Sequence, residues 1–241
     1  MPNGSLQDAL LGRRRPELVA EWPRRLAVAR DVAAALHYLH SVVTPAVVHG
    51  DVKPSNVLLD ADLRARLADF GLAQFKPDPD ADDGKPESGV IGYVAPEYGG
   101  GGPLSEKCDI YSYGVLLLVI ISGRRPLQVT ALPMSEFEKA SLISWAKHLA
   151  RASRLLDLVD PAMRDVNRDE ALLCITVALL CIQRSPARRP SSEEVIAMLS
   201  CEGELPQLPL EFSPSPPGGF PFKSRKKVRS VGLDPCLDAK R

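Results

Sequence analysis

Apolar residues recur at helical spacing along much of the chain. Between Glu21 and His40 they line one face of a long helix, at Leu26, Ala29, Ala33, Leu36 and Leu39. Two apolar runs, Val115 to Ile121 and Ala171 to Ile182, are shorter than the ~20 residues of a membrane span and are typical of buried core helices. Capping signals and periodicity predict further helices that begin near Ser5 and that span about 105–122, 136–151, 169–184 and 191–200.

The β-like runs are few and short. They are Val47-Val48, Val57 to Leu59, and Leu63 to Ala68, and the last two flank a turn at residues 60–62. Residues 76–89 and the glycine run 99–102 have no periodicity, so we expect loops there. From about residue 203 the chain is rich in proline and indicates a disordered tail. The pattern therefore predicts a mainly α domain with short β-hairpins.

Composition argues against several classes of protein. Thirty basic and thirty acidic residues give a formal net charge of zero, so no overall attraction to nucleic acid is expected. Five cysteines without C-x-x-C spacing predict neither a disulfide framework nor a zinc site, and we interpret them as reduced thiols. The N-terminus has no signal-peptide pattern. We therefore expect a cytoplasmic chain without a transmembrane segment.

Four polar residues near the short β-runs carry the candidate chemistry. Asp51, Lys53 and Asn56 lie in the run that begins at His49, and Asp69 opens the later sequence Asp-Phe-Gly. This set suits phosphoryl transfer, in which a protein positions the acceptor hydroxyl and neutralises phosphate charge. Asp51 would orient the acceptor and take its proton, and Lys53 would face the γ-phosphate. Asn56 and Asp69 would hold metal ions.

These residues resemble the H-x-D-x-x-x-x-N and D-F-G motifs of eukaryotic protein kinases, and residues 95–97 resemble A-P-E. Residues 1–6, 49–51 and 93–98 resemble plant receptor-like serine/threonine kinases of the type that lacks arginine before the catalytic aspartate. The resemblance runs from Met1 to about Leu199. No glycine-rich loop or V-A-I-K-like strand precedes His49. The resemblance therefore implies the C-terminal lobe of a kinase from the hinge onward, at 1–200, without the N-terminal lobe, and a tail at 203–241.

The resemblance implies a reaction and a set of roles. ATP and Mg²⁺ would be used to phosphorylate Ser and Thr hydroxyls of a protein substrate, in receptor-like kinase signalling. Family members are associated with the plasma membrane and have a cytoplasmic kinase domain. Asp51 and Lys53 would be catalytic, whereas Asn56 and Asp69 would bind metal and, with Leu58 beneath the adenine, the nucleotide. The structural support would come from His49 behind the loop, Glu97 paired with Arg189, and Asp109 accepting backbone N–H groups of the loop.

Gly50 replaces an arginine that would bind a phosphate on the activation segment, as in receptor-like kinases that are not switched by such a phosphate. Val90 replaces a threonine that would bridge Asp51 and Lys53. The missing glycine-rich loop and its lysine strand, together with Val90, leave a second function open. The alternative is a truncated, catalytically inactive lobe that acts as a protein-interaction module, with other kinases among its partners. A small-molecule phosphotransferase is disfavoured because Glu97 with Arg189 resembles the protein-directed kinases.

Overall fold

The computed structural model describes residues 1–12, 19–75, 92–127, 141–200, 206–209 and 212. The helices are α1 (Leu6–Leu11), α2 (Trp22–His37), α3 (Pro96–Gly99), α4 (Glu106–Ser122), α6 (Leu142–Arg151), α7 (Arg168–Cys181) and α8 (Ser192–Leu199). The strands are β1 (Val47–Val48), β2 (Val57–Leu59), β3 (Ala65–Leu67) and β4 (Gln74–Phe75). The mainly α prediction is confirmed. The loop predicted at 76–89, the start of the helix predicted at 136, and most of the predicted tail lie outside the described residues.

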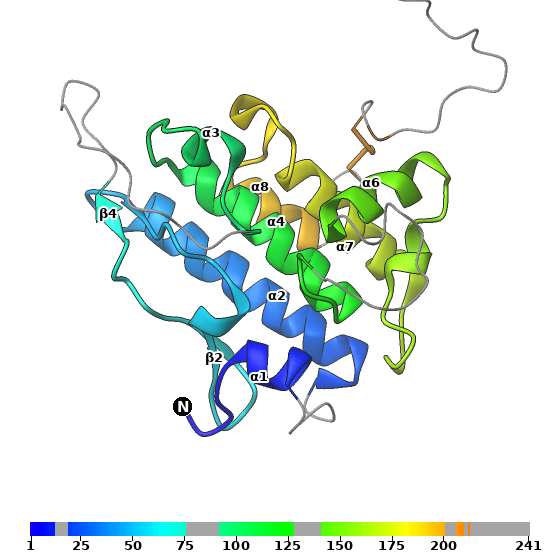
Figure 1. The fold of residues 1–241 in the computed structure, drawn as a ribbon. Coiled ribbons are helices and arrows are strands. Elements are labelled where there is room, and N and C mark those ends of the chain that lie inside the picture. The colour runs from blue at the N-terminus through cyan, green and yellow to red at the C-terminus, as the bar shows by residue number, and fades with distance from the viewer. Residues whose placement is uncertain (13–18, 76–91, 128–140, 201–205, 210–211, 213–241) are drawn as a thin grey trace, which may run out of the picture.

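Helix α4 forms the centre of the helical core. Fifteen of its seventeen residues are buried, because apolar side chains cover its whole circumference from Val115 to Ile121. It packs against α2, α6 and α7, and α8 packs against α2 and α7 (Figure 1). At Gly114 the approach of α7 is so close that an added Cβ would lie 2.6 Å from the Cβ of Cys181. The two longest apolar stretches of the sequence thus lie against each other.

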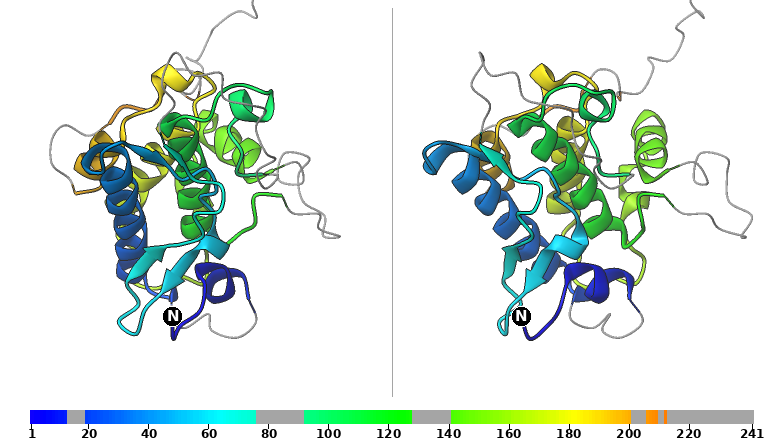
Figure 2. Two further views of the ribbon diagram at one scale, coloured as in Figure 1. Left: turned by 90° about the vertical axis from the view of Figure 1, so that its left-hand side faces the viewer. Right: turned by 60° about the vertical axis from the view of Figure 1, so that its left-hand side comes forward.

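The strands form two small antiparallel sheets beside this core. In the hairpin β2–β3, Val57 pairs with Leu67 and Leu59 with Ala65. Strand β1 pairs with β4, with Val47 opposite Phe75. The hairpin and α1 lie at one end of the molecule (Figure 2), where α2 packs against β3. The backbone between β1 and β2, which carries Asp51, Lys53 and Asn56, is therefore fixed at both ends.

Local signals explain most helix boundaries. Ser5 accepts a hydrogen bond from the Asp8 N–H at the start of α1, and Ser191 forms a complete capping box with Glu194 at the start of α8. Helix α2 ends at His37 but continues as a π-helical turn over Tyr38–Val42. Within the described residues, none of the helices has the length and apolar character to cross a membrane.

Two elements were not predicted. Strand β4 is two residues long, too short for an alternating pattern to register. Helix α3 takes in Gly99, the first residue of the glycine run that was expected to be a loop. The Gly102 N–H donates to the Glu97 carbonyl at 2.9 Å, so the remaining glycines fold back onto the helix end. The prediction of a loop over all of 99–102 was wrong at Gly99.

Candidate active site

Asp51, Lys53 and Asn56 converge on one carboxylate oxygen. Lys53 Nζ lies 2.5 Å from Asp51 Oδ2, and Asn56 Nδ2 donates to the same oxygen at 2.8 Å. Asn56 Nδ2 also donates to the Asp51 carbonyl at 2.9 Å. The side chains of Asp51 and Lys53 are only 10 % and 17 % exposed. The carboxylate is therefore held in one orientation by a cation and an amide, and it keeps a limited opening to solvent.

The local backbone explains this convergence. After Lys53 the chain makes a 3-10 turn over Pro54–Asn56. Proline suits the start of a helical turn because its φ is already fixed and its missing N–H needs no partner there. The turn brings Asn56 back over Asp51, and β2 begins at the next residue. Proline at position 54 thus helps to place two polar side chains five residues apart at one point.

A buried carboxylate supports this loop from below. Asp109 of α4 is fully buried, and its Oδ1 accepts the Gly50 N–H at 2.8 Å. Its Oδ2 accepts the His49 N–H at 2.8 Å and lies 2.8 Å from His40 Nε2. The backbone contact implied for Asp109 is therefore present. The contribution of His40 was not predicted, although its place one residue beyond the apolar stripe of α2 indicates a side chain directed toward the core.

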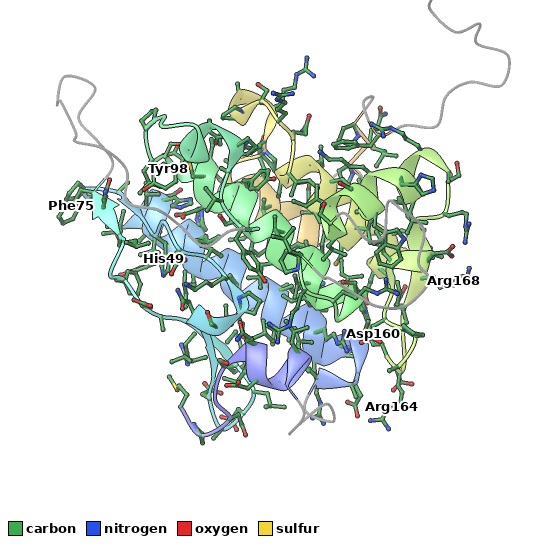
Figure 3. The ribbon with its side chains drawn as sticks, in the orientation of Figure 1. His49, Phe75, Tyr98, Asp160, Arg164 and Arg168 are labelled. Carbon is green, nitrogen blue, oxygen red and sulfur yellow. The ribbon has the colours of Figure 1, made fainter. Side chains whose placement is uncertain are left out.

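His49 connects the loop to the segment around Asp69. Its Nε2 lies 3.1 Å from the Ala68 carbonyl oxygen, and its ring meets the Phe70 ring edge-on at 4.9 Å. Asp69 lies between these two residues and has a left-handed backbone, with φ of 65°. The Ala68 N–H also donates to the Asn56 carbonyl at 2.8 Å. The two acidic residues of the candidate site are thus carried on backbone segments that contact each other through His49, which Figure 3 labels, and Asn56.

A pocket opens beside Asp51. Its walls come from the loop at 50–52, from the segment that carries Tyr93 and Tyr98, and from Leu104 and the first turns of α4. Ser112 of α4 donates to the Tyr93 carbonyl at 2.8 Å and so fixes that segment to the core. Burial raises the pKa of Tyr93, which keeps its hydroxyl protonated. Ser112 was not predicted, but its position three residues after Asp109 places it on the same face of α4.

The ion pair implied between Glu97 and Arg189 is present. Arg189 Nη1 lies 2.5 Å from Glu97 Oε1, and Nη2 lies 2.8 Å from Oε2. Burial favours the neutral acid, but the hydrogen bonds and the charge of Arg189, a backbone hydrogen bond and the contact with Cys108 together outweigh it and lower the pKa of Glu97. Cys108 Sγ lies 3.6 Å from Glu97 Oε1, and burial raises the pKa of this thiol. The pair ties α3, and the pocket wall next to it, to the loop before α8.

Comparison with known proteins decides the family. A family model described as "Protein kinase domain" matches residues 1–199. The chain belongs to the protein kinase domain family. It is 66 % identical, over 141 residues, to a receptor-like serine/threonine-protein kinase of Arabidopsis thaliana, and 57 % identical, over 142 residues, to a second one. Each match covers 58 % of this chain and 21 % of the relative. The chain thus spans about a fifth of the length of these relatives.

Protein kinase domains use Mg²⁺ with ATP, and the oxygen donors of this chain fit that ion. Asn56 engages its Nδ2 with Asp51, which leaves Oδ1 as an acceptor, and the Ser55 hydroxyl lies 3.3 Å from it. Asp69 is exposed, and its Oδ1 accepts the Gly71 N–H at 3.3 Å. Within the described ranges no group of three or more His, Cys, Asp or Glu side chains could hold a metal. Mg²⁺ needs only one or two protein carboxylates when phosphates supply other ligands.

Two further positions distinguish this kinase domain. Leu58 lies in the middle of β2, half-buried, and the segment at Ser5 bridges to it on the side away from β3. Gly50 has φ of +77°, and an added Cβ would lie 2.9 Å from the Leu72 carbonyl oxygen. The backbone after Asp-Phe-Gly therefore packs directly on Gly50. Val90 lies outside the described residues, so its effect stays a prediction.

Proposed function

We propose that this chain is the catalytic part of a serine/threonine protein kinase, which transfers the γ-phosphoryl group of ATP to Ser and Thr hydroxyls of proteins. The observation that carries the proposal is the convergence of Lys53 Nζ and Asn56 Nδ2 on Asp51 Oδ2, at 2.5 and 2.8 Å. Membership of the protein kinase domain family and similarity to two receptor-like serine/threonine-protein kinases support the choice of reaction. Signalling downstream of a receptor-like kinase belongs to the same proposal.

Asp51 is the residue that orients the acceptor. Its carboxylate lines the pocket beside the Tyr93 segment, where a protein hydroxyl could approach. Lys53 and Asn56 fix one oxygen of the carboxylate, so it needs little rearrangement to accept the hydroxyl proton. The Lys53 ammonium then faces the charge of the transferring phosphoryl group. Positioning and charge neutralisation, rather than covalent catalysis, account for the rate.

Asn56 and Asp69 would hold Mg²⁺ through Asn56 Oδ1 and the Asp69 carboxylate. A bound Mg²⁺ would supply positive charge that offsets the charge of the phosphates. Leu58 would contact the adenine from below, because it lies in β2 directly after the turn that carries Asn56. Asp109 and His49 act on the reaction only through the loop backbone that they support. In this proposal one group of residues contacts the substrates, and a second group, Asp109 and His49, positions the first.

The test is phosphate transfer by the longest natural chain that contains these 241 residues. We expect Mg²⁺-dependent incorporation of phosphate from ATP into Ser and Thr of a protein substrate, measured with radiolabelled ATP and phosphoamino-acid analysis. Asp51→Asn should lower the rate by at least about 10³-fold, since it removes the group that receives the proton. Asp62→Asn, an exposed change in the turn after β2, is the matched control and should leave the rate unchanged.

The same experiment distinguishes the proposed kinase from the alternative, a catalytically inactive interaction module. A chain that is folded and binds other kinases, but transfers no phosphate in wild-type form, would be an interaction module. Transfer that survives Asp51→Asn would contradict the assignment of Asp51. Phosphotyrosine as the main product would contradict the Ser/Thr specificity.

A further inference from the structure

Phe212 lies beyond the part of the chain that the family model matches, yet it is buried. The match ends at residue 199, and the Phe212 side chain is 2 % exposed. Lys147 Nζ of α6 lies over its ring, 5.2 Å from the centroid. Figure 1 shows this short stretch of the chain returning to the folded lobe beside α6. We call the position of the Phe212 ring beneath Lys147 the α6 site.

A backbone hydrogen bond joins Phe212 to Pro209. The Phe212 N–H donates to the Pro209 carbonyl at 2.8 Å. Leu208 is half-buried and packs against the same core. Proline at positions 206 and 209 restricts the free chain, so less conformational entropy is lost when the segment docks. Two apolar side chains, Leu208 and Phe212, thus anchor a partly preorganised segment.

Helix α6 provides a surface of suitable chemistry at the edge of the core. Its inner face, which includes Trp145 and Leu149, is buried, and the helix packs against α4 and the turn over Leu155–Leu158. On the same helix Lys147 places a cation over the Phe212 ring, an arrangement that favours an aromatic side chain over an aliphatic one. The charge of Lys147 at the α6 site therefore favours an aromatic residue.

Few apolar side chains among the described residues hold the segment. One buried ring and one half-buried leucine must offset the conformational entropy that is lost when Leu208, Pro209 and Phe212 dock. A contact of this kind is expected to open and close far more often than the core unfolds. An outside segment of the same chemistry can then compete for the site when it opens.

We propose that the α6 site is a peptide-docking site and that Leu208, Pro209 and Phe212 are its intramolecular ligand. The chemical class of the ligand is a short, proline-containing segment that ends in an aromatic ring. In the resting chain the site is occupied by this segment of the same molecule. The proposal does not depend on catalysis, because no residue of the proposed active site takes part.

The first experiment removes the ring from the full chain. Phe212→Ala should speed hydrogen exchange at the α6 amides by about tenfold while the α4 amides stay protected. Phe75→Ala removes a ring that is 66 % exposed and is the matched control, with no change at α6. Phe212→Leu keeps an apolar side chain without the ring and should give an intermediate rate, which covers the case in which Phe212→Ala does not fold. Equal α6 exchange in Phe212→Leu and wild type would overturn the proposal.

The second experiment supplies the ligand from outside. A synthetic peptide with the sequence of residues 206–212 should bind the Phe212→Leu and Phe212→Ala chains at least about tenfold more tightly than wild type, where the tethered segment competes. A peptide with alanine in place of the phenylalanine should not bind. Fluorescence anisotropy of the labelled peptide gives the affinities. The proposal is wrong if the peptide binds none of these chains or binds all of them equally. A wild-type dimer that Phe212→Leu dissociates would show that a second copy supplies the ring, which also overturns it.

Discussion

At the scale of single residues, Asp109 holds the backbone of the candidate active site in place. Its two oxygens accept the N–H groups of His49 and Gly50 and contact His40. The Asp109 carboxylate is fully buried, so water cannot replace these contacts. Asp51 follows Gly50 directly, so the position of its carboxylate depends on these contacts. Asp109 therefore positions Asp51 through the backbone of the loop and not through the side chains of the loop.

Asp109→Asn tests this support. The change replaces one oxygen by an NH₂ group, which then faces a buried N–H in either amide orientation. We expect the free energy of unfolding to fall by about 3 kcal/mol, since buried polar groups lose their partners. Asp157→Asn, a change on a side chain that is 43 % exposed, is the control and should change it by less than about 0.5 kcal/mol. Urea denaturation measures both, and equal stability of the two variants would contradict the role given to Asp109.

At the scale of elements, one ion pair joins parts of the fold that are distant in sequence. Glu97 belongs to α3, whereas Arg189 precedes α8 and is itself buried. Arg189 also donates to the Lys107 carbonyl at 2.8 Å and stacks over the Tyr111 ring at 4.8 Å, so it reaches α4 as well. Helix α3 has only four residues and could not persist without such a contact. The wall of the pocket beside Asp51 is therefore held by this pair.

The lowered pKa of Glu97 predicts how stability depends on pH. The ordinary pKa of this group is 4.5, and in the folded protein it is lower. The pair thus stabilises the fold fully above about pH 5, and the stabilisation is lost as pH falls through the lowered folded-state pKa. In Glu97→Gln this contribution is absent, so its stability should fall less steeply between pH 5 and 3. Thermal unfolding across that range measures the difference, with Glu193→Gln as control. Parallel curves for wild type and Glu97→Gln would contradict the prediction.

The sequence was sufficient for elements that have a repeated pattern. The helices at 105–122 and 191–200 were predicted to within one residue at each end, because a serine precedes each apolar stretch, although only Ser191 caps its helix through its side chain. The hairpin β2–β3 was predicted from two apolar runs around a turn. Strand β4 and helix α3 were not, since their stability comes from partners far along the chain, Val47 and Arg189. The side chains of the site were identified from a motif. Helical spacing indicates the faces on which His40 and Ser112 lie, but not their partners, which depend on tertiary packing.

At the scale of the whole molecule, a second buried arginine connects three segments of the core. Arg25 of α2 is 5 % exposed and donates to the Val19 carbonyl at 2.6 Å, to the Ile120 carbonyl of α4 at 2.8 Å and to Asp160 Oδ2 at 2.7 Å. Asp160 is 135 residues away in sequence and follows the turn after α6. No periodicity or motif predicts this pairing. It closes the end of the helical core opposite the candidate active site (Figure 3, near Asp160).

Arg25→Lys tests whether this network holds the helices together. Lysine keeps the charge but lacks the planar fork that reaches three acceptors at once, so at least one buried acceptor loses its donor. We expect a loss of about 3 kcal/mol in the free energy of unfolding, measured by urea denaturation. Arg24→Lys is the matched control from the neighbouring position, where the side chain is 43 % exposed and pairs with Glu21 at the surface. Arg24→Lys should lower the free energy of unfolding by less than about 0.5 kcal/mol.

Because Arg25 lies far from Asp51, the lost stability should leave the nucleotide affinity of the folded fraction unchanged. A change in affinity without a change in stability would mean that Arg25 belongs to the site rather than to the core.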